Sequence, residues 1–213
     1  MTTPFRRSAL ALAACAALAP AAARAQFLHK VGGTPQGEAL TGQEQEMLAI
    51  ANDFARRCAD AMEKWIATNQ TTEQRLFSAM YYPIPKTDPP KFTTDWDALS
   101  DRDIQPIEEA VLGKSSALVF AVLVDRNGYL PTHDLRYSQP LTGNLANDLV
   151  NNRTKRIFND RTGLAAARNK APFLIQRYQR DTGEIMADLS VPVLVRGKHW
   201  GAVRLGYRAA DAR

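Results

Sequence analysis

The sequence has little cysteine and histidine and lacks a second long apolar run. Its 213 residues contain two cysteines, Cys15 and Cys58, and three histidines, with no Cys-x-x-Cys or His-x-x-x-His pair. Structural zinc sites and covalent haem attachment use such pairs, so the sequence speaks against both. After the N-terminal segment, no stretch approaches the ~20 apolar residues of a membrane-spanning helix. The remaining composition, 45% hydrophobic and 23% charged, is typical of a globular domain.

Motifs of common enzyme classes are also missing. There is no Gly-x-Ser-x-Gly elbow, no glycine-rich phosphate loop and no carboxylate pair at a readable spacing. Ser138, Ser190 and His133 are present, but nothing in the sequence brings them together. Glu108 and Glu109 are adjacent and diverge on a helix, so we assign both to a solvated face. We expect a protein that is not an enzyme and has no cofactor.

The first 25 residues have the pattern of a secretory signal peptide. Arg6 and Arg7 precede an Ala/Leu-rich run that ends in an Ala-Arg-Ala pattern, so we expect cleavage before Gln26 and a periplasmic protein. The segment holds three of the 27 basic residues and no acid, which brings the formal charge from +5 to +2. A nearly neutral chain has no electrostatic footprint for nucleic acid.

Lipid attachment is an alternative to simple cleavage. Leu12-Ala13-Ala14-Cys15 resembles a lipobox, which would make Cys15 a lipid anchor. In either case Cys58 is the only other cysteine, so no intramolecular disulfide forms and a core must stabilise the fold. Cys58 lies on an apolar helical stripe, and we predict a buried side chain rather than a reactive thiol.

The remaining chain predicts one domain. Glycines and Pro35 mark residues 26–42 as a flexible lead-in, followed by a domain over 43–207 and a tail over 208–213. From 43 to 68 apolar residues recur every three or four positions, which predicts a long amphipathic helix.

Shorter helices and a loop follow that helix. The capping-box spacing of Thr71 and Gln74 predicts a helix over about 72–80. Four prolines then predict an extended loop from Tyr81 to Asp97. Pro106 and Gly113 bracket another short helix.

The second half of the chain changes to strands. Residues 118–124 predict a buried strand that turns at Asn127-Gly128 into a returning strand at 129–132. After a loop, Leu145, Leu149 and Val150 suggest a short helix. A meander of three strands is predicted over 172–180, 184–195 and 199–207.

Alternation along the last strand predicts its two faces. It places His199, Gly201, Val203, Leu205 and Tyr207 on one mostly apolar face, and the residues between them on the other. The fold class is therefore α+β, with about five antiparallel strands, a long N-terminal helix and a helical insertion over the sheet.

Three strings carry a resemblance to a known family. They are DRNGYLPTH from Asp125, NRTKRIFNDRTGLAA from Asn152 and GKHWGAVRLGY from Gly197. Together they resemble the PAS-like Cache sensory domains found with methyl-accepting chemotaxis proteins. The resemblance implies a sheet whose covering segments enclose a small-ligand pocket, and a long helix that passes the signal on. The chain lacks the transmembrane helix and signalling hairpin of a chemoreceptor, so a sensor of this kind would signal through a protein partner.

The insertion is rich in cations that suit an anionic ligand. Its guanidinium groups could bind a carboxylate, or could instead form ion pairs with Asp148, Asp160 or Asp188. Arg156 and Arg161 lie five residues apart and diverge by about 140° on a helix, so only one can face a pocket, and we favour Arg161. The complete set of candidate ligand-binding residues is Arg161, Arg156, Tyr129, His133, Tyr137, Arg168, Trp200 and Arg204.

Several of these candidates have structural alternatives. Trp200 would either form an aromatic wall or pack under the long helix, and His133 would serve as a hydrogen-bonding residue rather than a metal ligand. We hypothesise a sensory domain that binds a small polar or anionic metabolite between the sheet and residues 144–168 without turning it over. The alternatives are an accessory protein with a filled core, or a sensor with noncovalent haem on His133 or His199.

Overall fold

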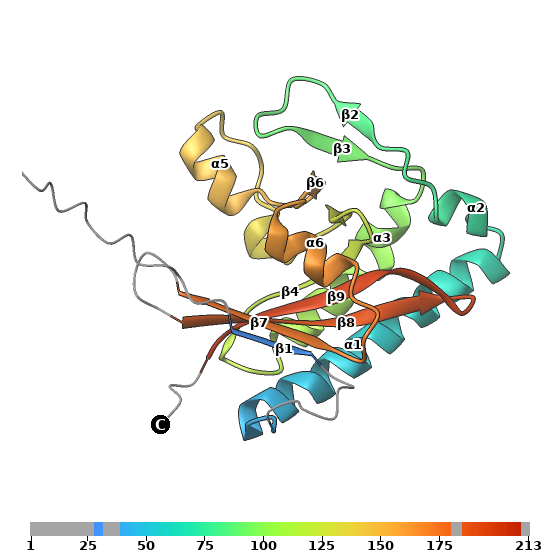
Figure 1. The fold of residues 1–213 in the computed structure, drawn as a ribbon. Coiled ribbons are helices and arrows are strands. Elements are labelled where there is room, and N and C mark those ends of the chain that lie inside the picture. Colours follow the sequence, from blue (N-terminus) through green and yellow to red (C-terminus); the bar gives the residue numbers. More distant parts are fainter. Residues whose placement is uncertain (1–27, 32–38, 180–184, 210–213) are drawn as a thin grey trace, which may run out of the picture.

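An antiparallel sheet with strand order β1-β7-β8-β9-β4 lies at the centre of the computed structural model, which describes residues 28–31, 39–179 and 185–209 (Figure 1). Its strands are β1 (Leu28–Val31), β7 (Leu174–Gln179), β8 (Ile185–Val195), β9 (Lys198–Arg208) and β4 (Leu118–Asp125). Helices α1 (Gly42–Ala67) and α4 (Gln105–Leu112) cover one face, and α6 (Arg161–Ala167) covers the other. The α+β class, the long N-terminal helix and the antiparallel sheet are confirmed.

Helix α1 begins and packs as its sequence predicts. The Thr41 hydroxyl accepts a hydrogen bond from the Glu44 N–H, and the Glu44 carboxylate accepts one from the Thr41 N–H. This capping box satisfies two otherwise unpaired donors. The apolar stripe, including Cys58, is buried against the sheet. Within the described residues, no helix is long and apolar enough to cross a membrane.

Three expectations for the first half are corrected. The lead-in contains strand β1, which pairs with β7. The second helix, α2 (Glu73–Leu76), is shorter than predicted and is capped by Thr72 instead of Thr71. The expected loop from 81 to 97 contains a hairpin of β2 (Tyr82–Ile84) and β3 (Lys91–Thr93). A two-stranded ribbon tolerates proline because half of its donors need no partner.

The Asn127-Gly128 turn forms, but the hairpin predicted from it does not. After this turn, β5 (Tyr129–Leu130) pairs with β6 (Arg156–Ile157), and β4 pairs with β9. Side chains occupy the outer edge of β4. The Glu108 carboxylate accepts the Leu123 N–H at 3.0 Å and the Asp134 carboxylate accepts the Ala121 N–H at 3.2 Å. The Arg136 guanidinium donates to the Val119 carbonyl.

The prediction that Glu108 and Glu109 face water is wrong. Glu108 is fully buried, and its burial, together with the neighbouring charge of Asp134, raises the pKa of its carboxyl well above the usual range. Glu109 is half-buried and accepts the Leu135 N–H. The sequence pattern could not show this burial, because it depends on how the chain packs. Helices α3 (Asp97–Asp103) and α4 place residue 108 directly against β4.

The C-terminal meander of β7, β8 and β9 is confirmed, with one correction to its faces. A bulge in the pairing falls between Val193 and Leu194, opposite Trp200. It breaks the strict alternation of β9, so Trp200 joins Val203 and Leu205 in the large core cluster under α1. The expected signal peptide, most of the lead-in, the turn at 181–183 and the last four residues lie outside the described residues.

Candidate functional site

The sheet face that α6 covers is partly apolar and partly charged. A small buried cluster joins α6 to the sheet through Val122, Val124, Leu130, Ala167 and Ala202, with Phe120 and Phe158 packed against it. Past this cluster, Arg204 of β9 forms an ion pair with Asp188 of β8, and their side chains are 12% and 1% exposed. The pairing register explains this contact, since Arg204 lies opposite Ser190 and Asp188 is its diagonal neighbour.

Two arginines of the insertion lie against one aromatic ring. The guanidinium carbons of Arg153 and Arg156 are 4.9 and 5.0 Å from the centroid of Phe158. We call these three residues the Phe158 cluster. Arg156 is half-buried and donates to the Leu149 carbonyl at 3.4 Å, and no described carboxylate forms an ion pair with it. Burial and the charge of Arg153 lower the pKa of Arg156.

A row of rings continues from this cluster across the sheet. The ring centroids of His133 and Tyr137 are 4.9 Å apart, and those of His133 and Phe120 are 6.5 Å apart. The guanidinium of Arg204 lies 5.9 Å from the Phe120 centroid. Tyr137 also accepts the Arg153 N–H through its backbone carbonyl at 2.6 Å, so the row and the cluster are joined.

His133 is a buried member of this row. Its side chain is 4% exposed, and Nδ1 lies 3.4 Å from the Asp134 carboxylate without a hydrogen-bond partner. Burial lowers the pKa of His133 and outweighs the attraction of Asp134. Burial therefore favours the neutral form of the imidazole, whose Nδ1 faces Asp134.

A second buried cation lies on β3. Lys91 is 7% exposed, and its ammonium donates to the side-chain carbonyl of Asn152, whose amide donates to the Gln139 carbonyl. Burial, followed by the charges of Lys155 and Arg156, lowers the pKa of Lys91 to about 8. A buried ammonium on β3 therefore lies near the guanidinium of Arg156.

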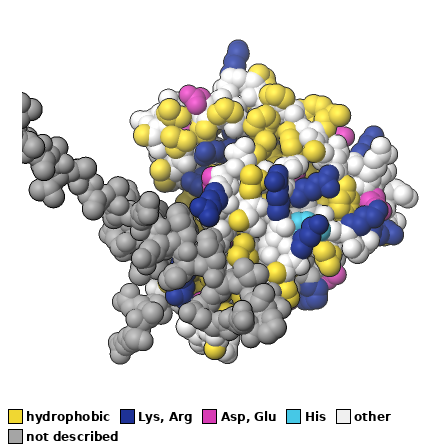
Figure 2. Space-filling model, in the orientation of Figure 1, with side chains coloured by type: hydrophobic (Ala, Val, Ile, Leu, Met, Phe, Trp, Pro, Cys, Tyr) yellow, Lys and Arg dark blue, Asp and Glu magenta, His cyan; other side chains and the backbone are white. Residues whose placement is uncertain are grey.

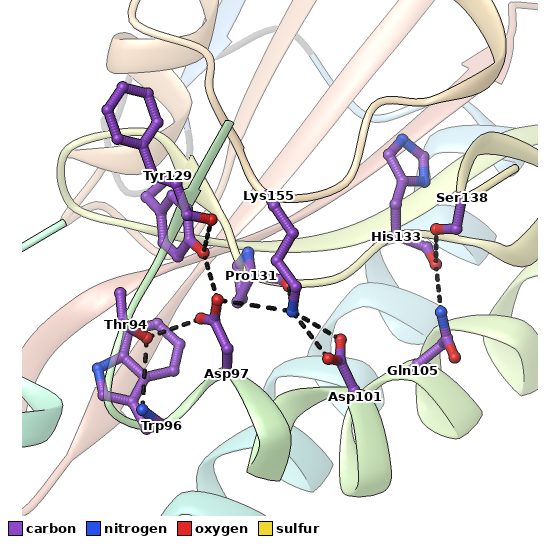
Figure 3. Close-up of polar contacts among 11 residues, drawn as sticks. Thr94, Trp96, Asp97, Asp101, Gln105, Tyr129, Pro131, His133, Ser138 and Lys155 are labelled. Carbon is purple, nitrogen blue, oxygen red and sulfur yellow. Dashed lines mark hydrogen bonds and ion pairs between the residues drawn. The ribbon is translucent and has the colours of Figure 1, made fainter. Parts of the chain in front are cut away.

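A separate polar network fastens the insertion to α3 (Figure 3). The Lys155 ammonium lies 2.8 Å from both Asp101 carboxylate oxygens and 2.7 Å from the Pro131 carbonyl. The Tyr129 hydroxyl donates to Asp97 at 2.7 Å. The Ser138 hydroxyl donates to the backbone carbonyl of His133, not to its ring. This network is structural, and it assembles no serine and histidine pair of the catalytic kind.

The structure separates the predicted site residues into two groups. His133, Tyr137, Arg156 and Arg204 lie along the row of rings and the Phe158 cluster. The others do not join them: Tyr129 is buried in the network of Asp97, Trp200 is buried and donates to the Leu76 carbonyl, and Arg161 and Arg168 are exposed.

Thr162-Gly163 suggest the end of a helix, which would let the Arg161 side chain turn inward. The structure reverses this order. Asp160 caps α6 by accepting the N–H groups of Thr162 and Gly163, so Arg161 is the first residue of a helix and points outward. Arg156 instead lies in the short strand β6 and takes the inner position that we assigned to Arg161.

Sequence reasoning missed Phe120, Phe158, Arg153 and Lys91 as parts of this site. Arg153 and Phe158 lie within the string that carried the family resemblance, so their spacing was the available signal. Lys91 lies among prolines and gave none. A hollow of about 300 Å³ is lined by Lys86, Asp88, Leu141, Gly143, Leu145 and Asp148, none of which was predicted.

No family model, curated protein or solved structure matches this chain. Within the described residues, no group of three or more His, Cys, Asp or Glu side chains could hold a metal ion. Half-buried guanidinium groups beside aromatic rings suit a small anion that has an apolar part.

Proposed function

We propose that this chain is a ligand-binding sensory domain of the PAS-like Cache type, and that it takes a small anionic metabolite at the Phe158 cluster. The observation that carries the proposal is Arg156, a half-buried cation without a carboxylate partner among the described residues. Removing a charge from water costs free energy that a counterion offsets. An anionic ligand would supply that counterion.

The neighbouring rings support a particular kind of ligand. Phe120, Tyr137 and the imidazole ring of His133 offer apolar contact. We therefore expect a carboxylate attached to a small apolar or aromatic body. Arg204 is already compensated by Asp188, so the Phe158 cluster is the stronger anchor for the carboxylate.

A thermal shift screen with small carboxylates tests this function. A ligand at a hundred times its dissociation constant adds about 2.7 kcal/mol to the free energy of unfolding. Arg156→Met should remove the shift, while Arg75→Met, which changes an exposed arginine on α2, should retain it. A library without any shift for the wild-type chain would contradict ligand binding.

The alternative of an accessory protein with a filled core has two observations in its favour. The small cluster of Val122, Leu130 and Ala167 fills the space between α6 and the sheet, and Arg204 is paired with Asp188. This alternative predicts that carboxylates shift neither the wild-type chain nor Arg156→Met. Signalling would then depend on a protein partner without a small ligand.

A further inference from the structure

Helix α5 (Leu145–Asn151) turns its apolar side chains outward. Leu145, Leu149 and Val150 are 46%, 39% and 57% exposed, and the preceding Leu141 is 38% exposed. The sequence pattern favours the opposite arrangement, with these residues against the core. We call these four residues the α5 apolar face.

A buried carboxylate holds α5 in this orientation. Asp148 is 1% exposed. It accepts the Thr142 hydroxyl at 2.7 Å and the N–H groups of Thr142 and Gly143 at 3.0 Å. The preceding loop therefore wraps around Asp148, and the inner side of α5 is polar. The leucines face out because a specific polar contact occupies the inner position.

The backbone of this segment is suited to contact with an apolar medium. The N–H groups of Thr142 and Gly143 are bonded to Asp148, that of Asn144 to the Thr142 hydroxyl, and that of Asn147 to the Asn144 side chain. A lipid phase offers no partner for an unpaired N–H, which costs several kcal/mol there. The start of α5 can therefore be covered by lipid without breaking these hydrogen bonds.

The α5 apolar face lies at an outer corner of the molecule beside the β2–β3 turn, on the opposite side of the sheet from α1 (Figure 1). Figure 2 shows apolar side chains gathered over that end, with basic groups among them. Lys86 lines the hollow beside Leu141 and Leu145, and Arg156 donates to the Leu149 carbonyl. Asp88 is the one exposed acid that lines the hollow.

We propose that the α5 apolar face docks on an anionic lipid surface. Its aliphatic side chains enter the boundary between headgroups and acyl chains, while the exposed Lys86 beside Leu141 and Leu145 meets the lipid phosphates. A protruding corner of aliphatic side chains suits a bilayer, which deforms around it, better than a protein partner, which would need a matching groove. The charge of Lys86 beside the patch favours an anionic rather than a neutral surface.

Vesicle co-sedimentation of the full chain tests this proposal. We expect binding to phosphatidylcholine vesicles that contain phosphatidylglycerol, and at least about tenfold weaker partitioning for Leu149→Asp and Val150→Asp, since each removes apolar contact and adds a repelled charge. The matched control is Leu194→Asp, because Leu194 is 53% exposed beside the β8–β9 turn. This control variant should bind as the wild type does, and salt should weaken the binding.

A second measurement separates a loss of lipid binding from a failure of the variant to fold. Leu149→Trp should show a blue-shifted emission on anionic vesicles, while far-ultraviolet circular dichroism confirms that each variant is folded. The proposal is overturned if the wild-type chain does not bind, if Leu194→Asp loses binding equally, or if the patch variants dissolve a dimer, since a second copy would then cover the face. Binding of an acidic amphipathic peptide in place of vesicles would also overturn it. The carboxylate thermal shift does not depend on these outcomes.

Discussion

The surroundings of single residues in the fold determine how the stability of this protein depends on pH. Glu108 is fully buried, and burial with the nearby charge of Asp134 raises the pKa of its carboxyl. A carboxyl with a raised pKa in the fold contributes stability below its unfolded value of 4.5, and that contribution is lost as pH rises.

Glu108→Gln should therefore stabilise the protein at high pH. The amide oxygen can still accept the Leu123 N–H, and the side chain cannot ionise. We expect the variant to be at least about 1 kcal/mol more stable than the wild type at pH 8, with the difference shrinking toward pH 4.5. Urea unfolding at the two pH values measures this. An equal loss of stability at both values would show that folding does not raise the pKa of Glu108.

His133 predicts the opposite pH dependence. Burial lowers the pKa of its imidazole below the usual 6.5. Just below that pH, the unfolded chain therefore binds a proton at His133 more readily than the folded chain does. The unfolding free energy should therefore fall as pH drops from 7 to 5. In His133→Gln this fall should be smaller, because the variant lacks the titrating group. Identical pH profiles for both proteins would show that folding does not shift the pKa of His133. The charged groups that face it, Asp134, Arg153 and Arg136, stay unchanged in the comparison.

At the level of elements, the β4–β5 turn approaches the insertion closely. Substituting two glycines, one at this contact and one away from it, measures how much the close approach matters for stability. Gly128 and Gly197 both have positive φ, at 81° and 71°. A methyl group on Gly128 would overlap the Phe158 carbonyl, while one on Gly197 would meet nothing within 4 Å. Gly197→Ala should cost about 1 kcal/mol from backbone conformation alone. Gly128→Ala should cost about 2 to 4 kcal/mol, because overlap with the backbone adds to it.

Thermal or urea unfolding of the two variants checks this difference. Equal losses would mean that the insertion is free to move away from the turn. Because Phe158 belongs to the candidate site, Gly128→Ala should also weaken any carboxylate shift.

The sequence predicts those elements that are determined by residues close together in the chain. The amphipathic period of α1, the Asn127-Gly128 turn and the three meander strands are all present. Elements whose position depends on distant partners were missed. The strand after Gly128 pairs with β6 because Glu108 and Asp134 already occupy the edge of β4, and no local pattern encodes that competition.

The candidate site was likewise predicted where local sequence determines it and missed where distant contacts do. The cation-rich composition pointed to the insertion, which contains Arg156, and His133 was proposed from its place after the predicted hairpin. Which arginine faces inward depends on where α6 begins, and the Asp160 cap that decides this was not recognised. Trp200 was misplaced because a bulge changes the face of one residue without a signature in sequence.

At the scale of the whole molecule, Lys155 joins the insertion to the helical layer. Its ammonium contacts Asp101, Asp97 and the Pro131 carbonyl. Lys155→Met should lower the free energy of unfolding by about 2 to 3 kcal/mol, since Asp97 is buried and would lose its nearest cation. Lys155 has positive φ, and methionine bears the same backbone strain, so the change reports the contacts.

The matched control for this change is Lys86→Met, which alters an exposed lysine that also has positive φ. It should leave stability within about 0.5 kcal/mol of the wild type. Urea unfolding measures both variants. A loss no larger for Lys155 than for Lys86 would show that contacts other than those of the Lys155 ammonium hold the insertion.

The side chains along the outer edge of β4 also limit how molecules of this protein can associate. An exposed strand normally offers a row of free amides and carbonyls that another chain can extend, which is the starting point of fibril growth. Here Glu108, Asp134 and Arg136 already occupy positions that an added strand would need. The sheet therefore cannot lengthen by recruiting a neighbour at this edge, even at high concentration.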